Sequence, residues 1–244
     1  MRGFSDGARL GITHSRDYAM GTNITLQAAD GHSFDAYAAQ PADGKRYGGI
    51  VVVQEIFGVN QHVRDTVDLY AAQGYTAIAP ALYDRVQKNY ESGYEQADIQ
   101  AGLAVRQKVP LEGALADIKA SIDHLAKQDM TVGIVGYCYG GMLVWQSAAK
   151  IDGLSAAVSY YGGGVQDQGD LQAKCPTMLH FGEKDHAIPI DKVKAFVAKQ
   201  PDLKVHIYDA NHGFNCDHRG SYDATAAKTA LDRTLTFFGE NLGK

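Results

Sequence analysis

Residues 131–142 read Thr131-Val-Gly-Ile-Val-Gly136-Tyr-Cys138-Tyr-Gly140-Gly-Met142 and indicate the fold more clearly than any other segment of the chain. The first half is apolar and rich in β-branched residues, which is typical of a buried strand. The second half favours the start of a helix, and glycines flank Cys138 between the two halves. A cysteine on a tight turn between a strand and a helix is typical of a nucleophile that the backbone presents at the edge of a sheet.

Short apolar runs and amphipathic segments alternate on both sides of this turn. Before it comes a β-hairpin, expected at residues 22–29 and 33–40 around Asp30-Gly31. Further strands are expected at 49–53, 76–79, 132–135, 156–160, 177–181 and 204–208. Helices are expected near 63–71, 93–106, 111–127, 140–150, 190–200 and 221–239, with a polar surface loop at 162–174. This alternation predicts an α/β fold with one mostly parallel sheet and helices on both faces.

The composition suits a single domain that acts on a small molecule. With 244 residues, 45% of them hydrophobic, the chain is long enough to bury its own core. Residues 1–21 are polar and are expected to form an extension to a domain at 22–244. A net charge of −5 without a basic cluster argues against a nucleic-acid partner. No apolar run approaches the roughly 18 residues of a membrane helix, so no membrane partner is expected. Three cysteines suit a reducing compartment, and we expect a cytoplasmic protein that is a monomer by default.

Partners for Cys138 are expected after later strands, in the order acid and then histidine. Asp185 follows the strand expected at 177–181, and His212 follows the strand expected at 204–208. Because the carboxyl ends of parallel strands meet at one edge, these side chains are expected to converge on Cys138. Glu183 is an alternative acid, although the Gly-x-x-Asp spacing favours Asp185. His186 is expected at the rim of the site.

The strand expected at 49–53 ends in Gln54-Glu55-Ile56-Phe57-Gly58. Glu55 lies either beside the nucleophile or at the surface, and spacing alone favours the surface. The same turn is expected to supply one backbone N–H of an oxyanion hole, and Tyr139 the other.

A second group of residues raises the question of a metal site. His212, Cys216, Asp217 and His218 are close in sequence, but their spacing matches no zinc pattern. We therefore expect no metal and no organic cofactor.

The sequence resembles the dienelactone hydrolase (carboxymethylenebutenolidase) family of α/β-hydrolases over roughly residues 22–240. This resemblance rests on six motifs: Gln54-Glu-Ile-Phe-Gly-Val-Asn60, Ala79-Pro-Ala-Leu-Tyr-Asp-Arg85, Gly136-Tyr-Cys-Tyr-Gly-Gly141, Tyr160-Tyr-Gly162, Gly182-Glu-Lys-Asp185 and His212-Gly-Phe214. The cysteine turn together with the Gln-Glu-Ile-Phe-Gly strand end is specific to this family.

The resemblance implies a role for each matching residue of the reaction centre. It implies that Cys138, Asp185 and His212 form a catalytic triad. It also implies that Glu55 helps to ionise the thiol when substrate arrives, and that the oxyanion-hole donors are the N–H groups of Ile56 and Tyr139.

The resemblance also implies how a substrate is held. Arg85 matches the family arginine that binds the substrate carboxylate, and Phe57 and Tyr161 fall in motifs that line the substrate. Family members carry a second arginine shortly after the histidine, in a His-Ser-Phe-x-Arg stretch. This chain has Cys216 there, and Arg219 follows three residues later as a candidate replacement.

The sequence therefore predicts a cysteine-dependent hydrolase that opens a carboxylated lactone through an acyl-enzyme on Cys138. The alternative within the same chemistry is a general carboxylesterase or thioesterase for small substrates. A non-catalytic binder or thiol sensor is a third hypothesis, and it predicts ligand binding without product.

Overall fold

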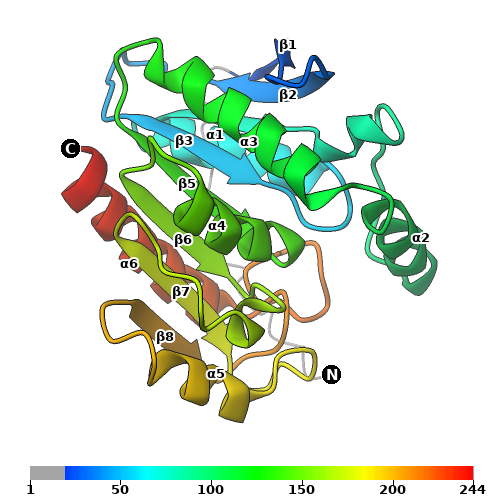
Figure 1. The fold of residues 1–244 in the computed structure, drawn as a ribbon, viewed down its shortest axis with the longest axis vertical. Coiled ribbons are helices and arrows are strands. Elements are labelled where there is room, and N and C mark those ends of the chain that lie inside the picture. The colour runs from blue at the N-terminus through cyan, green and yellow to red at the C-terminus, as the bar shows by residue number, and fades with distance from the viewer. Residues whose placement is uncertain (1–19, 244) are drawn as a thin grey trace, which may run out of the picture.

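The computed structural model describes residues 20–243, and within this range the chain forms one eight-stranded sheet flanked by helices (Figure 1). The strand order is β1-β2-β4-β3-β5-β6-β7-β8. The strands from β4 to β8 are parallel, and β1 and β2 join them as an antiparallel hairpin beside β4. The predicted α/β fold is confirmed.

The strands lie where the apolar runs indicated. Their bounds are β1 Thr22–Gln27, β2 Ser33–Ala39, β3 Gly49–Val53, β4 Thr76–Pro80, β5 Val132–Tyr137, β6 Ala156–Tyr160, β7 Thr177–Gly182 and β8 Lys204–Tyr208. Every residue of the central strands β3 to β7 is buried, because helices cover the sheet on both sides.

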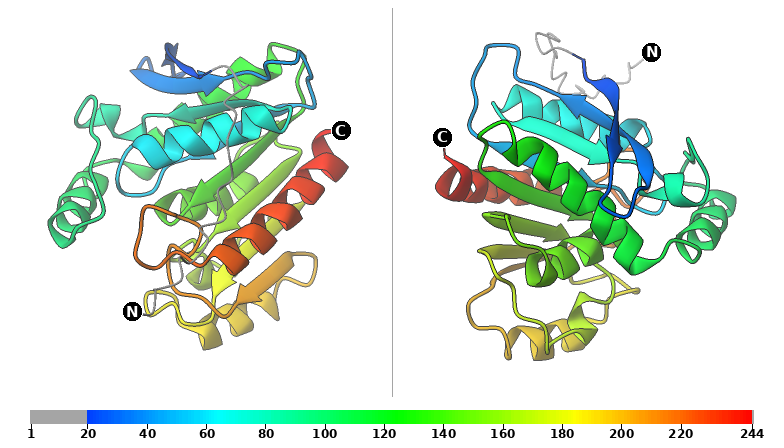
Figure 2. Two further views of the ribbon diagram at one scale, coloured as in Figure 1. Left: turned by 180° about the vertical axis from the view of Figure 1, so that it is seen from behind. Right: turned by 45° about the horizontal axis from the view of Figure 1, so that its top comes forward.

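The helices form two layers and one outlying segment. Their bounds are α1 Gln61–Ala72, α2 Gln96–Arg106, α3 Leu111–Ala126, α4 Tyr139–Lys150, α5 Ile190–Val197 and α6 Ala224–Leu242, with the 3₁₀ turns η1 Leu82–Arg85 and η2 Val165–Asp167. Figure 1 shows α3 and α4 in front of the sheet, and Figure 2 shows α1 and α6 on the opposite face. Helix α2 stands apart from both layers (Figure 1).

Some elements differ from the prediction: β1 ends at Gln27 rather than near 29, and α2 begins at Gln96 rather than near 93. Helix α6 begins at Ala224 rather than near 221, because the Asp223 carboxylate accepts hydrogen bonds from the first backbone N–H groups and caps the helix. Helix α5 ends at Val197 rather than near 200. The segment 162–174 is not simply a surface loop, since it contains η2 and the fully buried Val165.

The extension predicted for residues 1–21 falls almost wholly outside the described residues. Of the described helices, none is both long and apolar enough to cross a membrane.

Strand register explains how distant residues meet. Val53 of β3 pairs with Gly136 of β5, so Glu55 and Cys138 each lie two residues past this pair, just beyond the ends of two adjacent strands. Gly182 of β7 likewise pairs with Tyr208 of β8. The turns after these four strands share the carboxyl edge of the sheet, where open α/β folds place their sites.

Candidate active site

Cys138 lies between β5 and α4 in a backbone conformation that L-residues rarely adopt. Its φ is 54° and its ψ is −113°, and its N–H donates to the carbonyl of Tyr160 at 3.0 Å. Such a conformation costs about 1–3 kcal/mol and persists only where the surroundings enforce it. Cys138 is partly exposed, so a small molecule can approach this residue.

Two glycines allow the turn around Cys138 to pack closely. A Cβ at Gly136 would lie 2.3 Å from the carbonyl oxygen of Gly140. A Cβ at Gly140 would lie 2.3 Å from the carbonyl oxygen of Val53. Both approaches are too short for any larger residue, so the turn packs against the end of β3 only because these positions are glycine.

His212 and Asp185 form a pair beside the cysteine. His212 Nδ1 lies 2.7 Å from Asp185 Oδ2, and the Asp185 side chain is fully buried. The other carboxylate oxygen of Asp185 accepts from the N–H of Ala187 at 2.8 Å, which fixes its orientation. Glu183, the alternative acid, is exposed, and so is His186.

The charge of His212 depends on these neighbours. Burial lowers the pKa of His212, but the negative charge of Cys138 and hydrogen bonds to Asp185 and Cys138 outweigh burial and raise it to about 10. The arrangement therefore favours a protonated His212 that lies between Cys138 and the buried Asp185 carboxylate.

Glu55 is buried rather than at the surface, and it is paired with Arg219. The glutamate is 2% exposed, and its Oε1 lies 3.3 Å from Arg219 Nη1. Its other oxygen, Oε2, is buried and has no hydrogen-bond partner among residues 20–243. The guanidinium of Arg219 lies over the rings of Phe57 and Tyr94, at 5.7 and 5.9 Å from their centroids. Arg219 therefore brings a positive charge to this edge of the sheet from a position three residues after Cys216.

Arg219 also lies close to Cys138. Burial lowers the pKa of Arg219, but the charges of Glu55 and Cys138 raise it above its ordinary value. Arg219 is thus within electrostatic reach of both Glu55 and Cys138.

Tyr161 packs directly against His212. The two rings meet edge to face with centroids 5.1 Å apart, and Tyr161 has a positive φ of 37°. Its side chain is fully buried and its hydroxyl has no hydrogen-bond partner within the described residues. Burial, followed by the charges of Glu55 and Cys216, raises the pKa of this hydroxyl well above its ordinary value.

The two predicted oxyanion-hole donors lie just after the ends of β3 and β5, beside Glu55 and Cys138 in the sequence. Ile56 follows Glu55 in the turn after β3, and Tyr139 is the first residue of α4. The N–H of Tyr139 is therefore among the first four of a helix, which have no partner inside it.

Arg85 is bound by carboxylates of other elements and not by the residues around Cys138. Its Nε and Nη2 donate to the Asp117 carboxylate at 2.8 and 2.7 Å, and its Nη1 donates to Asp30 at 2.8 Å. These contacts join η1 to α3 and to the hairpin turn, so the structure does not bring Arg85 to the group around Cys138.

Sequence reasoning missed Arg106, whose guanidinium carbon lies 4.9 Å from the ring centroid of Tyr139. Arg106 is the last residue of α2, and an arginine at a helix end carries no sequence signal for such a contact.

Comparisons with known proteins identify the family of the chain. The sequence matches the model of the dienelactone hydrolase family over residues 34–242. It is 34% identical over 224 residues to a carboxymethylenebutenolidase of Pseudomonas putida, a match that covers 88% of this chain and 94% of the relative. A crystal structure of a candidate dienelactone hydrolase from Klebsiella pneumoniae superposes with a TM-score of 0.77 at 30% identity, covering 90% of this chain and 99% of that one. A dienelactone hydrolase-like phosphotriesterase from metagenomic libraries, at 22% identity and a TM-score of 0.71, shares the fold; it covers 92% of this chain and 100% of its own.

With a family match over most of its length and relatives at this level of identity, the chain belongs to the dienelactone hydrolase family and is a dienelactone hydrolase-like ester or lactone hydrolase.

Proposed function

We propose that the protein opens carboxylated lactones through an acyl-enzyme on Cys138. The observation that carries this proposal is the pairing of His212 with the buried Asp185 beside a cysteine held at positive φ. That combination supports a nucleophile, a base and a group that orients the base. The three cysteines are all free, which suits the reducing cytoplasm that we propose as the location.

The reaction has two steps. The Cys138 thiol gives up its proton, and the sulfur attacks the carbonyl carbon of the lactone to form a tetrahedral oxyanion. The N–H groups of Ile56 and Tyr139 would stabilise that oxyanion, each by about 3 kcal/mol. Collapse breaks the ring C–O bond, leaving a thioester and an enolate that takes up the proton of His212. Water then attacks the thioester as the now neutral His212 accepts a proton from it. The carboxylic acid product forms, and the departing thiolate takes up a proton again.

The buried ion pair supports a way to link thiol ionisation to substrate arrival. A substrate carboxylate competes with Glu55 for the guanidinium of Arg219, which lies near Cys138. Once released, the buried Glu55 carboxylate is free to accept the thiol proton. We therefore assign to Arg219 the substrate-binding role that the family motif implied for Arg85, because Arg85 is bound to Asp117 and Asp30.

The engagement of Arg85 also favours a second candidate function. Because Arg85 is already bound, Arg219 is the only one of the two predicted arginines that is available to bind a substrate carboxylate. A site with a single such arginine would also suit small uncharged esters or thioesters. Comparing a carboxylated ester with its neutral methyl analogue separates the two. The lactone proposal predicts a strong preference for the anion that Arg219→Ala abolishes, whereas equal rates on both esters favour a general esterase.

The deciding experiment follows the ultraviolet absorbance of a dienelactone with purified protein and with two variants. Cys138→Ala should abolish turnover, and Cys175→Ala, a matched change at a half-buried cysteine far along the chain, should leave it intact. Turnover that survives Cys138→Ala refutes the acyl-enzyme. Ligand binding without product in the wild type would indicate a binder rather than an enzyme.

A further inference from the structure

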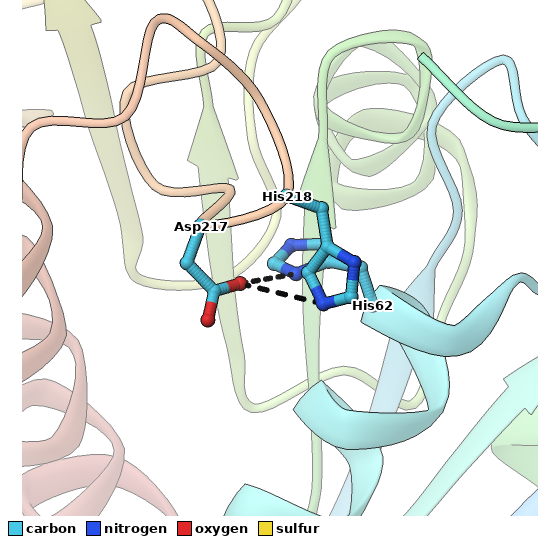
Figure 3. Close-up of side chains that lie close together, drawn as sticks. All are labelled: His62, Asp217 and His218. Carbon is cyan, nitrogen blue, oxygen red and sulfur yellow. Dashed lines mark ion pairs between the residues drawn. The ribbon is translucent and has the colours of Figure 1, made fainter.

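Three side chains that could bind a metal lie together at the rim of the candidate active site. His62 comes from the first turn of α1, and Asp217 and His218 come from the loop that precedes α6 (Figure 3). Figure 3 shows both imidazole rings facing the same carboxylate oxygen. The structure thus separates Asp217 and His218 from His212, with which the sequence had grouped them.

Two of the three distances within this group are close to those between the ligands of one tetrahedral ion. Asp217 Oδ1 lies 3.4 Å from His62 Nδ1 and 3.7 Å from His218 Nε2, and the ligand atoms of all three residues lie within 4.8 Å of one another. An ion bound at 2.0–2.2 Å by nitrogen and oxygen ligands holds neighbouring ligands about 3.3–3.6 Å apart. Two of the three separations are already close to this value, so small side-chain rotations complete the set.

We propose that His62, Asp217 and His218 form a binding site for a divalent first-row transition metal of the Zn²⁺ type. Two imidazoles and one carboxylate are the donors that such ions prefer, whereas Mg²⁺ and Ca²⁺ prefer oxygen ligands alone. Three protein ligands leave a fourth position for water or for another side chain. Asp65 is the candidate for that position, since its Oδ2 lies 3.8 Å from His218 Nε2.

Burial makes one side of the site rigid and leaves the other accessible. The His62 side chain is 7% exposed and is held by α1, whereas Asp217 and His218 are 65% and 39% exposed. His62 and His218 also line an open cavity of about 440 Å³ together with Tyr94. A dissolved ion can therefore reach a partly preformed set of ligands.

The position of the site links it to the ion pair described above. Asp217 and His218 directly precede Arg219, whose guanidinium contacts Glu55. A bound ion would join α1 to the loop that carries Arg219. The proposal for the metal site stands without any assumption about catalysis, because it is tested by binding alone.

The test titrates tag-free, metal-stripped protein with Co²⁺, followed by visible absorption, and with Zn²⁺, followed by calorimetry. Because Cys138 and His212 could bind soft metals themselves, the titration is repeated in Cys138→Ser. We expect one equivalent of metal in both proteins, with d–d bands of a nitrogen- and oxygen-ligated Co²⁺ and no thiolate charge-transfer band.

Ligand variants identify the site. His218→Ala and Asp217→Asn change exposed side chains, so both variants should fold normally. Each should weaken Zn²⁺ binding more than about tenfold, since even residues outside the coordination shell change affinity by 10–100-fold. His124→Ala, a change at a half-buried histidine on α3, should leave affinity unchanged.

Two outcomes overturn the proposal. Undetectable binding in the wild type means that the three residues form only an ion-paired cluster. Binding that is lost in Cys138→Ser but survives His218→Ala assigns the metal to the thiol instead.

Discussion

Replacing Arg219 with alanine should destabilise the protein far more than removing an ordinary surface charge. Arg219 is the only hydrogen-bond or ion-pair partner of the Glu55 side chain among the described residues, and that glutamate is 2% exposed. Arg219→Ala therefore leaves a carboxylate that is buried and unpaired.

The size of the effect follows from the geometry. At 3.3 Å and an effective dielectric constant of about 20, two unit charges attract by about 5 kcal/mol. Removing one partner of a buried pair costs about 3–5 kcal/mol, because the remaining charge has lost its compensation. For a chain of this length the cost corresponds to a fall in Tm of about 6–20 °C. Glu55→Gln should cost less, about 1–2 kcal/mol, since the Arg219 side chain is 17% exposed and stays over the Phe57 ring.

The assay is urea unfolding of both single variants and of the double variant, which completes a double-mutant cycle. The double variant Glu55→Gln/Arg219→Ala should be more stable than Arg219→Ala alone, because it no longer buries an unpaired charge. Lys228→Ala, which removes an exposed pair with Asp232, is the control and should cost less than about 1 kcal/mol. An Arg219→Ala cost below 1 kcal/mol, or a double variant no more stable than Arg219→Ala, refutes the reasoning.

Three further outcomes are expected. Asp185→Asn should lower kcat about 10³–10⁴-fold with an unchanged circular dichroism spectrum, because His212 loses the group that orients it; a loss below tenfold contradicts the pairing. Gly140→Ala should lower the free energy of unfolding by about 2–3 kcal/mol, since its Cβ would lie 2.3 Å from a backbone oxygen, whereas Gly163→Ala, with open space around it, should change it by less than about 0.5 kcal/mol. Burial lowers the pKa of His212, but Cys138 and Asp185 raise it to about 10. Protonated His212 therefore stabilises the fold fully below pH 6.5, and this contribution is lost as the pH rises toward 10. Urea midpoints of wild type and His212→Gln should therefore converge between pH 7 and pH 10, and a constant difference contradicts the shift.

The strands and the turn at Cys138 could be predicted because their signals are local. A buried parallel strand is a short apolar run, and β6 and β8 have the predicted bounds. The meeting of Asp185 with His212 could also be anticipated, because both follow strands whose carboxyl ends share one edge. Their catalytic roles remain a proposal.

The contacts of individual long side chains could not be predicted in the same way. Arg85 lies in a motif typical of the family, but its position depends on Asp117 and Asp30, which belong to other elements. His62 carries no signal of its own, since its partner Asp217 comes from a distant part of the chain. Glu55 was expected at the surface from spacing alone, but it is buried and pairs with Arg219, which comes from the distant loop before α6.

The conformation of Cys138 restricts which residues evolution can place there. Backbone packing, not the sulfur, enforces its φ of 54° and ψ of −113°, so the turn can keep this conformation when the side chain changes. Serine has the same shape and is reached from cysteine by a single base change in the codon. A β-branched residue would add a second heavy atom on Cβ to a backbone that is already strained. The same turn can therefore exchange a thiol for an alcohol in one mutational step, whereas its backbone conformation disfavours threonine and valine at this position.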